Sequence, residues 1–210
     1  MPKELTLRRL ITRIDEEHIG FHVTDAVGHA MPAALLTIFL KQAMVMRQTN
    51  GNDYTILEPS QVIQTLNEKM AAQKLSGYQF ATACYCLLNI NSLELTYARA
   101  GHPYPVLIRD GQPQQLEIQG PLLGIFDQSI YPQQTIQLQT GDKLLIYSDG
   151  AEPFIGGVDE ERGFVFNDEF LEAMKLPAVE LIDALNNIAR NKKISPSEVD
   201  DITALALEIC

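Results

Sequence analysis

The chain has no long apolar run and no export signal. The sequence of 210 residues contains no uninterrupted apolar stretch that approaches the length of ~20 residues that a membrane-spanning helix needs. The first ten residues, MPKELTLRRL, also lack the apolar core of a secretory signal peptide. These two absences argue against a helical membrane protein and against a secreted precursor. We therefore expect a cytoplasmic protein.

Cysteines and cations are both scarce. The three cysteines, Cys84, Cys86 and Cys210, form neither a disulfide framework nor a zinc-binding pattern, and the first two are expected as buried thiols on one face of a strand. The 16 Lys and Arg residues are outnumbered by 27 Asp and Glu residues, which gives a net charge of −11. Because nucleic acids and anionic membranes bind clustered cations, neither is an expected partner. The negative charge is compatible with a cation-binding site.

Linkers, low-complexity tracts and internal repeats are absent as well. The chain is 46% hydrophobic, and its 210 residues are enough to bury a substantial core. We therefore expect a single domain over residues 1–210.

The hydrophobic pattern alternates between helical and strand periods along the chain. Helices are expected near the front and again before the last strand, at residues 32–48, 59–75, 167–174 and 178–191. Strands are expected at residues 18–24, 79–101 (a hairpin that turns at 89–92), 105–119, 135–139, 143–148 and 201–209. This order predicts an α+β fold with segregated layers and mostly antiparallel sheets.

Aspartates stand where the expected strands begin or end. Asp25 ends the first strand, Asp149 follows the apolar run in LIYSDGAE, and Asp200 and Asp201 precede the last strand. If these strand ends converge, the ionised carboxylates repel one another unless a cation lies between them. Oxygen ligands without cysteine or paired histidine favour magnesium or manganese over zinc. Alternatively, the Asp-Gly pair at Asp149 is only a turn sequence.

Five segments in order carry a resemblance to a known family. They read DAVGHAMPAALL, YARAGHPYPVLIRDG, GPLLGIF, LIYSDGAE and VDDITALALEI. In order and spacing they resemble the metal-dependent serine/threonine protein phosphatases of the type-2C (PPM) superfamily, and most closely its bacterial SpoIIE-like branch, which acts on regulators of sigma factors. The resemblance extends over residues 18–210.

The resemblance implies an α-β-β-α sandwich of two mostly antiparallel sheets flanked by helices, with two Mn²⁺ or Mg²⁺ ions at one end of the sheets. Asp25 then resembles the carboxylate that bridges both ions, and the backbone carbonyl of Ala26 completes the first site. Asp149 and Asp200 resemble the ligands of the second ion. Through the bound metals these aspartates are catalytic, because a water between two cations is acidified and attacks phosphorus in line.

Several other residues near these motifs have either a functional or a purely structural interpretation. Gly28 fits the turn between strand and helix, and His29 either donates a hydrogen bond or proton near the site or packs in that turn. Asp201 either supports the metal ligands by accepting a hydrogen bond or caps the last strand. His102 is interpreted as part of a hairpin exit. Glu152 falls one place earlier than the acid found after SDG in this branch, so it is not assigned to the metal.

One motif of the family is missing. Family members carry a Gly-Asp segment before the DxxGH motif, and its aspartate helps to hold the first metal. Counting back from Asp25 reaches Leu7, where no such motif exists; Glu4 is a weak candidate, and residues 15–17 are interpreted as the acidic turn of a hairpin. Either the chain is a truncation of a longer protein with an N-terminal sensor or receiver domain, or this residue is absent and only one metal site is occupied.

Three functions are compatible with these observations. The favoured one is a Mn²⁺- or Mg²⁺-dependent phosphatase that hydrolyses phosphoserine or phosphothreonine on a bacterial signalling protein, such as an anti-sigma-factor antagonist. The second is a catalytically impaired, phosphatase-like binding module in a signalling pathway, which the missing aspartate would explain. The third is a metal hydrolase for a small phosphoester.

Overall fold

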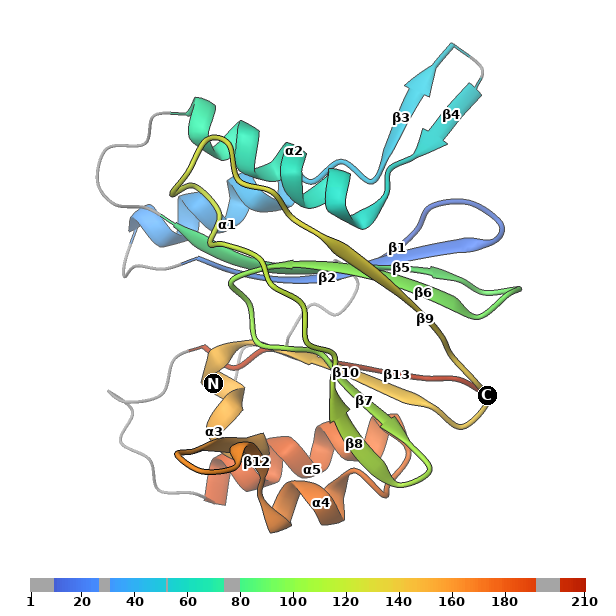
Figure 1. Cartoon of the computed structure of the whole chain (residues 1–210), viewed down its shortest axis with the longest axis vertical. Coiled ribbons are helices and arrows are strands. Elements are labelled where there is room, and N and C mark those ends of the chain that lie inside the picture. The colour runs from blue at the N-terminus through green and yellow to red at the C-terminus, as the bar shows by residue number, and fades with distance from the viewer. Residues whose placement is uncertain (1–9, 27–30, 52, 74–79, 192–200) are drawn as a thin grey trace. The chain divides into compact units, whose positions relative to one another are not determined.

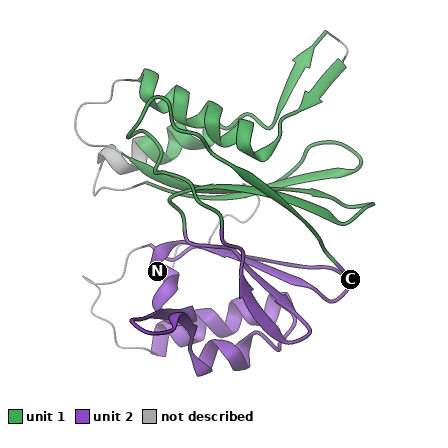
Figure 2. Cartoon of the chain, viewed as in Figure 1, with its two compact units in different colours: residues 1–102, 118–138 green, residues 103–117, 139–210 purple. Residues whose placement is uncertain are grey.

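The chain folds into two compact units. The computed structural model describes residues 10–26, 31–51, 53–73, 80–191 and 201–210. Unit 1 comprises residues 1–102 and 118–138, and unit 2 comprises residues 103–117 and 139–210 (Figure 2). Among the described residues, no helix is long and apolar enough to cross a membrane. The single domain over 1–210 stays a prediction, and each unit is described by itself.

Unit 1 is built on a five-stranded sheet in which every neighbouring pair is antiparallel. Its strands, in spatial order, are β1 (Ile11–Arg13), β2 (His18–Ala26), β5 (Ala81–Asn89), β6 (Glu94–Ala100) and β9 (Gln133–Gln137). Helices α1 (Met31–Ala43) and α2 (Pro59–Ala72) cover one face of this sheet (Figure 1). A separate hairpin, β3 (Arg47–Asn50) with β4 (Asp53–Ile56), connects the two helices.

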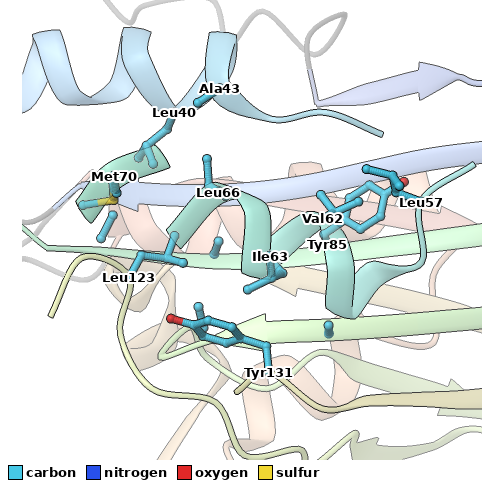
Figure 3. Close-up of a cluster of buried hydrophobic side chains, with 14 of the residues drawn as sticks. Leu40, Ala43, Leu57, Val62, Ile63, Leu66, Met70, Tyr85, Leu123 and Tyr131 are labelled. Atoms are coloured by element: carbon cyan, nitrogen blue, oxygen red, sulfur yellow. The ribbon is translucent and has the colours of Figure 1, made fainter. Parts of the chain in front are cut away.

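Helix α2 illustrates why the core of unit 1 forms here. Its start is fixed by a capping box between Glu58 and Gln61, with Pro59 in the first turn. The stripe predicted from the sequence is fully buried at Val62, Ile63, Leu66 and Met70. These side chains pack in a cluster with residues of the sheet, among them Tyr85 (Figure 3).

The predicted hairpin between β5 and β6 is confirmed. The Asn89 side-chain oxygen accepts hydrogen bonds from the backbone N–H groups of Asn91 and Ser92, both at 2.9 Å, which closes the turn at the predicted residues. Strand β2 pairs with β5 along its whole length, from His18 opposite Asn89 to Ala26 opposite Ala81. The first strand is therefore longer than expected and includes Asp25.

Unit 2 contains a four-stranded antiparallel sheet. Its spatial order is β13 (Ala204–Glu208), β10 (Lys143–Tyr147), β7 (Val106–Arg109) and β8 (Gln112–Gln115). Helices α4 (Asp168–Ala173) and α5 (Ala178–Asn191) supply Phe170, Leu181 and Leu185 to a cluster with Leu145 and Tyr147 of β10. The remaining elements are the 3₁₀ helix η2 (Asp149–Ala151), the short helix α3 (Glu152–Ile155) and the hairpin of β11 (Gly156–Asp159) and β12 (Gly163–Phe166).

The predicted α+β class, with mostly antiparallel sheets flanked by helices, is confirmed. The prediction for the helix at 32–48 was wrong at its end. The helix stops at Ala43, and the chain turns into β3 because Leu57 N–H donates to the carbonyl of Met46 at 2.9 Å and the two strands pair. Gly51, with φ of +64°, forms the turn between them.

Candidate active site

The end of β2 positions Asp25. Asp25 lies opposite Thr82 of β5, and Ala26 lies opposite Ala81, so backbone pairing fixes both residues. Strand β1 pairs only with residues from Ile19 to Phe21, which leaves the end of β2 with a single described neighbour. The Asp25 side chain is half-buried. A strand end that is paired on one side can present both a carboxylate and a backbone carbonyl at the rim of the sheet.

The loop around His102 packs beside this strand end. The His102 ring is 1% exposed, and its Nδ1 is hydrogen-bonded to the Thr82 hydroxyl at 2.8 Å. Gly101 has φ of +59°, and a Cβ there would lie 2.4 Å from Cδ2 of Leu122. The loop therefore needs glycine, and it holds His102 against the residue that pairs with Asp25. The sequence reasoning did not single out Thr82, because an isolated threonine in a strand carries no local signal.

The second strand end positions Asp149 differently. All five residues of β10 are buried, and Asp149 opens the 3₁₀ turn that follows, with its side chain exposed. Its Oδ1 accepts the N–H of Gly150 at 2.8 Å. The Asp-Gly pair does form a turn, of the 3₁₀ type, and the chain continues from η2 directly into α3. The metal-binding role of Asp149 stays a prediction.

Ser148 connects Asp149 to the start of the last strand. Its backbone N–H donates to the Thr203 carbonyl at 2.9 Å, and its hydroxyl donates to the Asp201 carbonyl at 2.9 Å. The same hydroxyl accepts the N–H of Thr203 at 2.9 Å. Ser148 is 2% exposed, so these bonds replace its hydration completely. Asp149 and Asp201 therefore lie on adjoining segments, and sequence reasoning had missed the residue that joins them.

Carboxylates repel each other near Asp149. Burial raises the pKa of Glu152, and the negative charge of Asp149 raises this pKa further. A cation near Asp149 would relieve that repulsion, and the side chains are oxygen donors of the kind that Mg²⁺ and Mn²⁺ prefer. The donor chemistry thus fits the metal expected from the sequence. Within the described part of the chain, no three His, Cys, Asp or Glu side chains gather closely enough to hold a metal ion.

The predicted site residues fall into three groups. Asp25 and Ala26 belong to unit 1, and Asp149 and Asp201 belong to unit 2. Gly28, His29 and Asp200 lie outside the described residues, as do Glu4 and Leu7. Asp201 follows Asp200 directly in the sequence, and the Ser148 bonds hold the segment that begins at Asp201 next to Ser148. The convergence of Asp25 with Asp149 stays a prediction.

Comparison with known proteins gives a consistent picture. The family model of Stage II sporulation protein E (SpoIIE) matches residues 15–209. The phosphoserine phosphatase RsbU of Bacillus subtilis (strain 168) is 33% identical over 138 residues, which cover 65% of this chain and 39% of RsbU. The chain spans less than half the length of the curated relatives it matches.

Solved structures share the fold. The RsbU and RsbW domains of Rv1364c from Mycobacterium tuberculosis superpose with a TM-score of 0.69 at 26% identity, covering 91% of this chain and 52% of that one. The catalytic domain of the serine/threonine protein phosphatase PstP, in complex with 2 manganese ions, gives a TM-score of 0.64 at 17% identity, covering 96% of this chain and 95% of that one. The second likeness concerns the fold alone.

Proposed function

Because the chain belongs to the Stage II sporulation protein E (SpoIIE) family, we propose that it is a metal-dependent phosphatase that removes phosphate from serine or threonine of a bacterial signalling protein. The observation that carries this proposal is the exposed carboxylate of Asp149 at the end of a buried strand, tied through Ser148 to the segment that contains Asp201. A carboxylate on so fixed a backbone is suited to coordinate an ion, in addition to the hydrogen bond that it accepts from the N–H of Gly150.

In this proposal some residues bind the metal ions and others hold those ligands in position. Asp25, the carbonyl of Ala26, Asp149 and Asp200 would hold two Mn²⁺ or Mg²⁺ ions. When bound, such ions supply an acidified water and offset the charge of the phosphoryl group. Ser148 keeps Asp149 and the Asp201 segment in register. Glu152, whose pKa is raised, stays out of the ligand set.

Two relatives support the proposed substrate class. RsbU is a phosphoserine phosphatase, and the Rv1364c structure combines an RsbU domain with an RsbW domain. These similarities support a phosphoserine protein in sigma-factor regulation as the substrate, and an anti-sigma-factor antagonist is our specific proposal. The net charge of −11 disfavours an acidic surface as the docking site of the partner.

Phosphate release from a phosphoserine protein, with Mn²⁺ and with a chelator, tests the proposal. We expect release that needs Mn²⁺ and that is lost in Asp149→Asn. Asp183→Asn is the matched control, because this variant makes the same chemical change at an exposed position of α5 in the same unit. Folded protein without metal-stimulated release, or Asp149→Asn with full activity, would contradict the proposal.

The binding-module alternative is favoured by one observation, namely that no Gly-Asp motif precedes Asp25 in the sequence. It predicts tight binding of a signalling partner that Asp149→Asn leaves unchanged, together with no metal-stimulated phosphate release. A preference for p-nitrophenyl phosphate over a phosphoserine protein would instead favour a hydrolase of small phosphoesters.

A further inference from the structure

Unit 1 contains a cavity away from the strand ends described above. It lies between the β1–β2 hairpin and the segment that joins α1 to β3, and its volume is about 660 Å³. Cavities of roughly 300–1,000 Å³ are typical of small-molecule sites. Part of the wall is apolar and is formed by Ile14, Met44, Val45 and Met46.

Three cations also line this cavity. Arg13 donates to the carbonyls of Asp15 and Glu16, and Arg47 donates to the carbonyl of Ile14, so their charges are not matched by carboxylates in these bonds. Lys41 makes no ion pair with any described residue. The Asp15 carboxylate lies near Arg47, because it accepts the Tyr54 hydroxyl while Arg47 stacks on the Tyr54 ring. Lys41 is therefore the cation of this wall that favours an anion.

His22 supplies a buried polar atom that calls for a ligand. The side chain lines the cavity and is 5% exposed, and its Nδ1 has no hydrogen-bond partner among the described residues. Burial, with a smaller effect from Lys41, lowers the pKa of His22 to about 4, so the ring is neutral and Nδ1 can carry a proton to donate. An unsatisfied buried polar atom is costly. Nδ1 has almost no accessible surface of its own, so the ring must turn slightly for a ligand in the cavity to accept its hydrogen bond and remove that cost.

A second buried polar atom lies beside the same wall. The Tyr85 hydroxyl is buried and has no hydrogen-bond partner among the described residues. Gly20 leaves room for it, because a Cβ at Gly20 would lie 2.8 Å from the hydroxyl, 3.0 Å from Ile14 and 3.1 Å from Met46. Ile14 and Met46 both line the cavity. Because Gly20 has no side chain, the Tyr85 hydroxyl can lie next to the apolar wall of the cavity.

We propose that this cavity binds a small organic anion with an apolar body. The anionic group lies near Lys41 and accepts a hydrogen bond from His22, and the apolar body packs against Met44, Val45 and Met46. Neither Asp25 nor Asp149 takes part, so the proposal goes beyond the phosphatase function and does not depend on it.

The probe for the test is 8-anilinonaphthalene-1-sulfonate, an aromatic sulfonate whose fluorescence reports binding. The whole chain is titrated with the probe at neutral pH, with calorimetry for stoichiometry. We expect one saturable site, and we expect Lys41→Glu to weaken binding by at least about tenfold, because a charge-assisted contact is lost. Arg162→Glu is the matched control, since it makes the same change of charge at an exposed residue in the other unit.

A second variant tests the place of the apolar body. Val45→Phe fills part of the cavity without changing charge, and we expect it to weaken the probe at least as much as Lys41→Glu does. Circular dichroism confirms that each variant is folded. Binding that neither variant weakens, binding without a defined stoichiometry, or equal weakening by Arg162→Glu would overturn the proposal.

Discussion

The two strand ends that carry the candidate aspartates are built in different ways. Asp25 is half-buried within β2, and the ladder with β5 fixes its backbone. Asp149 is exposed one residue beyond the buried strand β10, and the hydroxyl of Ser148 fixes the chain there. The position of Asp25 thus rests on many backbone bonds, and that of Asp149 rests heavily on one side chain. Changes near Asp149 should therefore disturb the site more.

The largest effect is expected when either carboxylate is neutralised. Asp25→Asn and Asp149→Asn should each lower kcat/KM for a phosphoserine substrate by about 1,000-fold, because a lost metal ligand removes several kcal/mol of charge stabilisation. The melting temperature should change little at Asp149, which is exposed. Steady-state kinetics and a thermal melt check both statements. A loss of activity that merely follows loss of folding would contradict them.

Acid should weaken the two units unequally, because the buried His22 lies in unit 1. The pKa of His22 falls from 6.5 to about 4, mainly through burial. Between pH 6.5 and about 4, His22 therefore binds a proton in the unfolded chain but not in the folded chain. The free energy of unfolding falls as the pH is lowered through this range. Arg13, Lys41 and Arg47 are the cations around the same cavity, and burial raises the pKa of the Tyr85 hydroxyl, which therefore stays neutral.

This shift corresponds to a loss of about 3 kcal/mol at most over that range. Hydrogen exchange of β2 and β10 at pH 7 and pH 4.5, corrected for intrinsic rates, measures the free energy of opening in each unit. We expect a larger fall in β2 than in β10, and a smaller one in β2 of the His22→Gln variant. Equal falls in wild type and variant would show that His22 is not the cause.

Ser148→Ala removes the hydroxyl that positions Asp149. The Mn²⁺ concentration for half-maximal activity should rise about tenfold, as it does when groups that orient metal ligands are lost. Ser148→Thr keeps a hydroxyl, so its half-maximal Mn²⁺ concentration should lie between that of the wild type and that of Ser148→Ala. Ser129→Ala is the control, because Ser129 is 7% exposed and its hydroxyl also donates to a backbone carbonyl, that of Phe126, at 3.0 Å. If both alanine variants shift the Mn²⁺ dependence equally, Ser148 has no positioning role.

The smallest effect is expected at Thr82→Val. The variant removes a hydrogen bond to the buried His102, which should cost about 1 kcal/mol of unfolding free energy by urea titration. Its Mn²⁺ dependence should shift less than that of Ser148→Ala, since the backbone ladder still holds Asp25. Thr96→Val, which breaks the 2.9 Å contact with Thr135, serves as the control. A larger shift than at Ser148 would reverse the comparison.

The sequence predicted those features that depend on local pattern. The stripe of α2 and the turn after Asn89 follow from spacing and turn chemistry, and both are confirmed. The role of Ser148 could not be predicted, because its partners Asp201 and Thr203 lie 53 and 55 residues away in the chain. The hairpin of β3 and β4 was missed although Asn50 and Gly51 form a turn sequence, because the apolar pattern of α1 continues past its last residue.

The cavity of unit 1 likewise depends on tertiary structure. His22 comes from β2 and Lys41 from α1, and nothing in the spacing of these residues indicates that they share a cavity. Gly20 reads as an unremarkable residue within a strand, yet its missing side chain makes room for the Tyr85 hydroxyl. Alternation predicts which face of a strand is buried but not what lies against it.

We propose that Asp25, held by the backbone ladder of β2, and Asp149, held through Ser148, serve one metal-dependent reaction. A double-mutant cycle tests it most directly, with Mn²⁺-stimulated phosphate release measured for wild type, Asp25→Asn, Asp149→Asn and the double variant. Groups that act as a unit are strongly non-additive. We predict that the double variant loses scarcely more activity than either single variant. Losses that multiply, or a single variant that keeps its Mn²⁺-stimulated activity, would contradict the account.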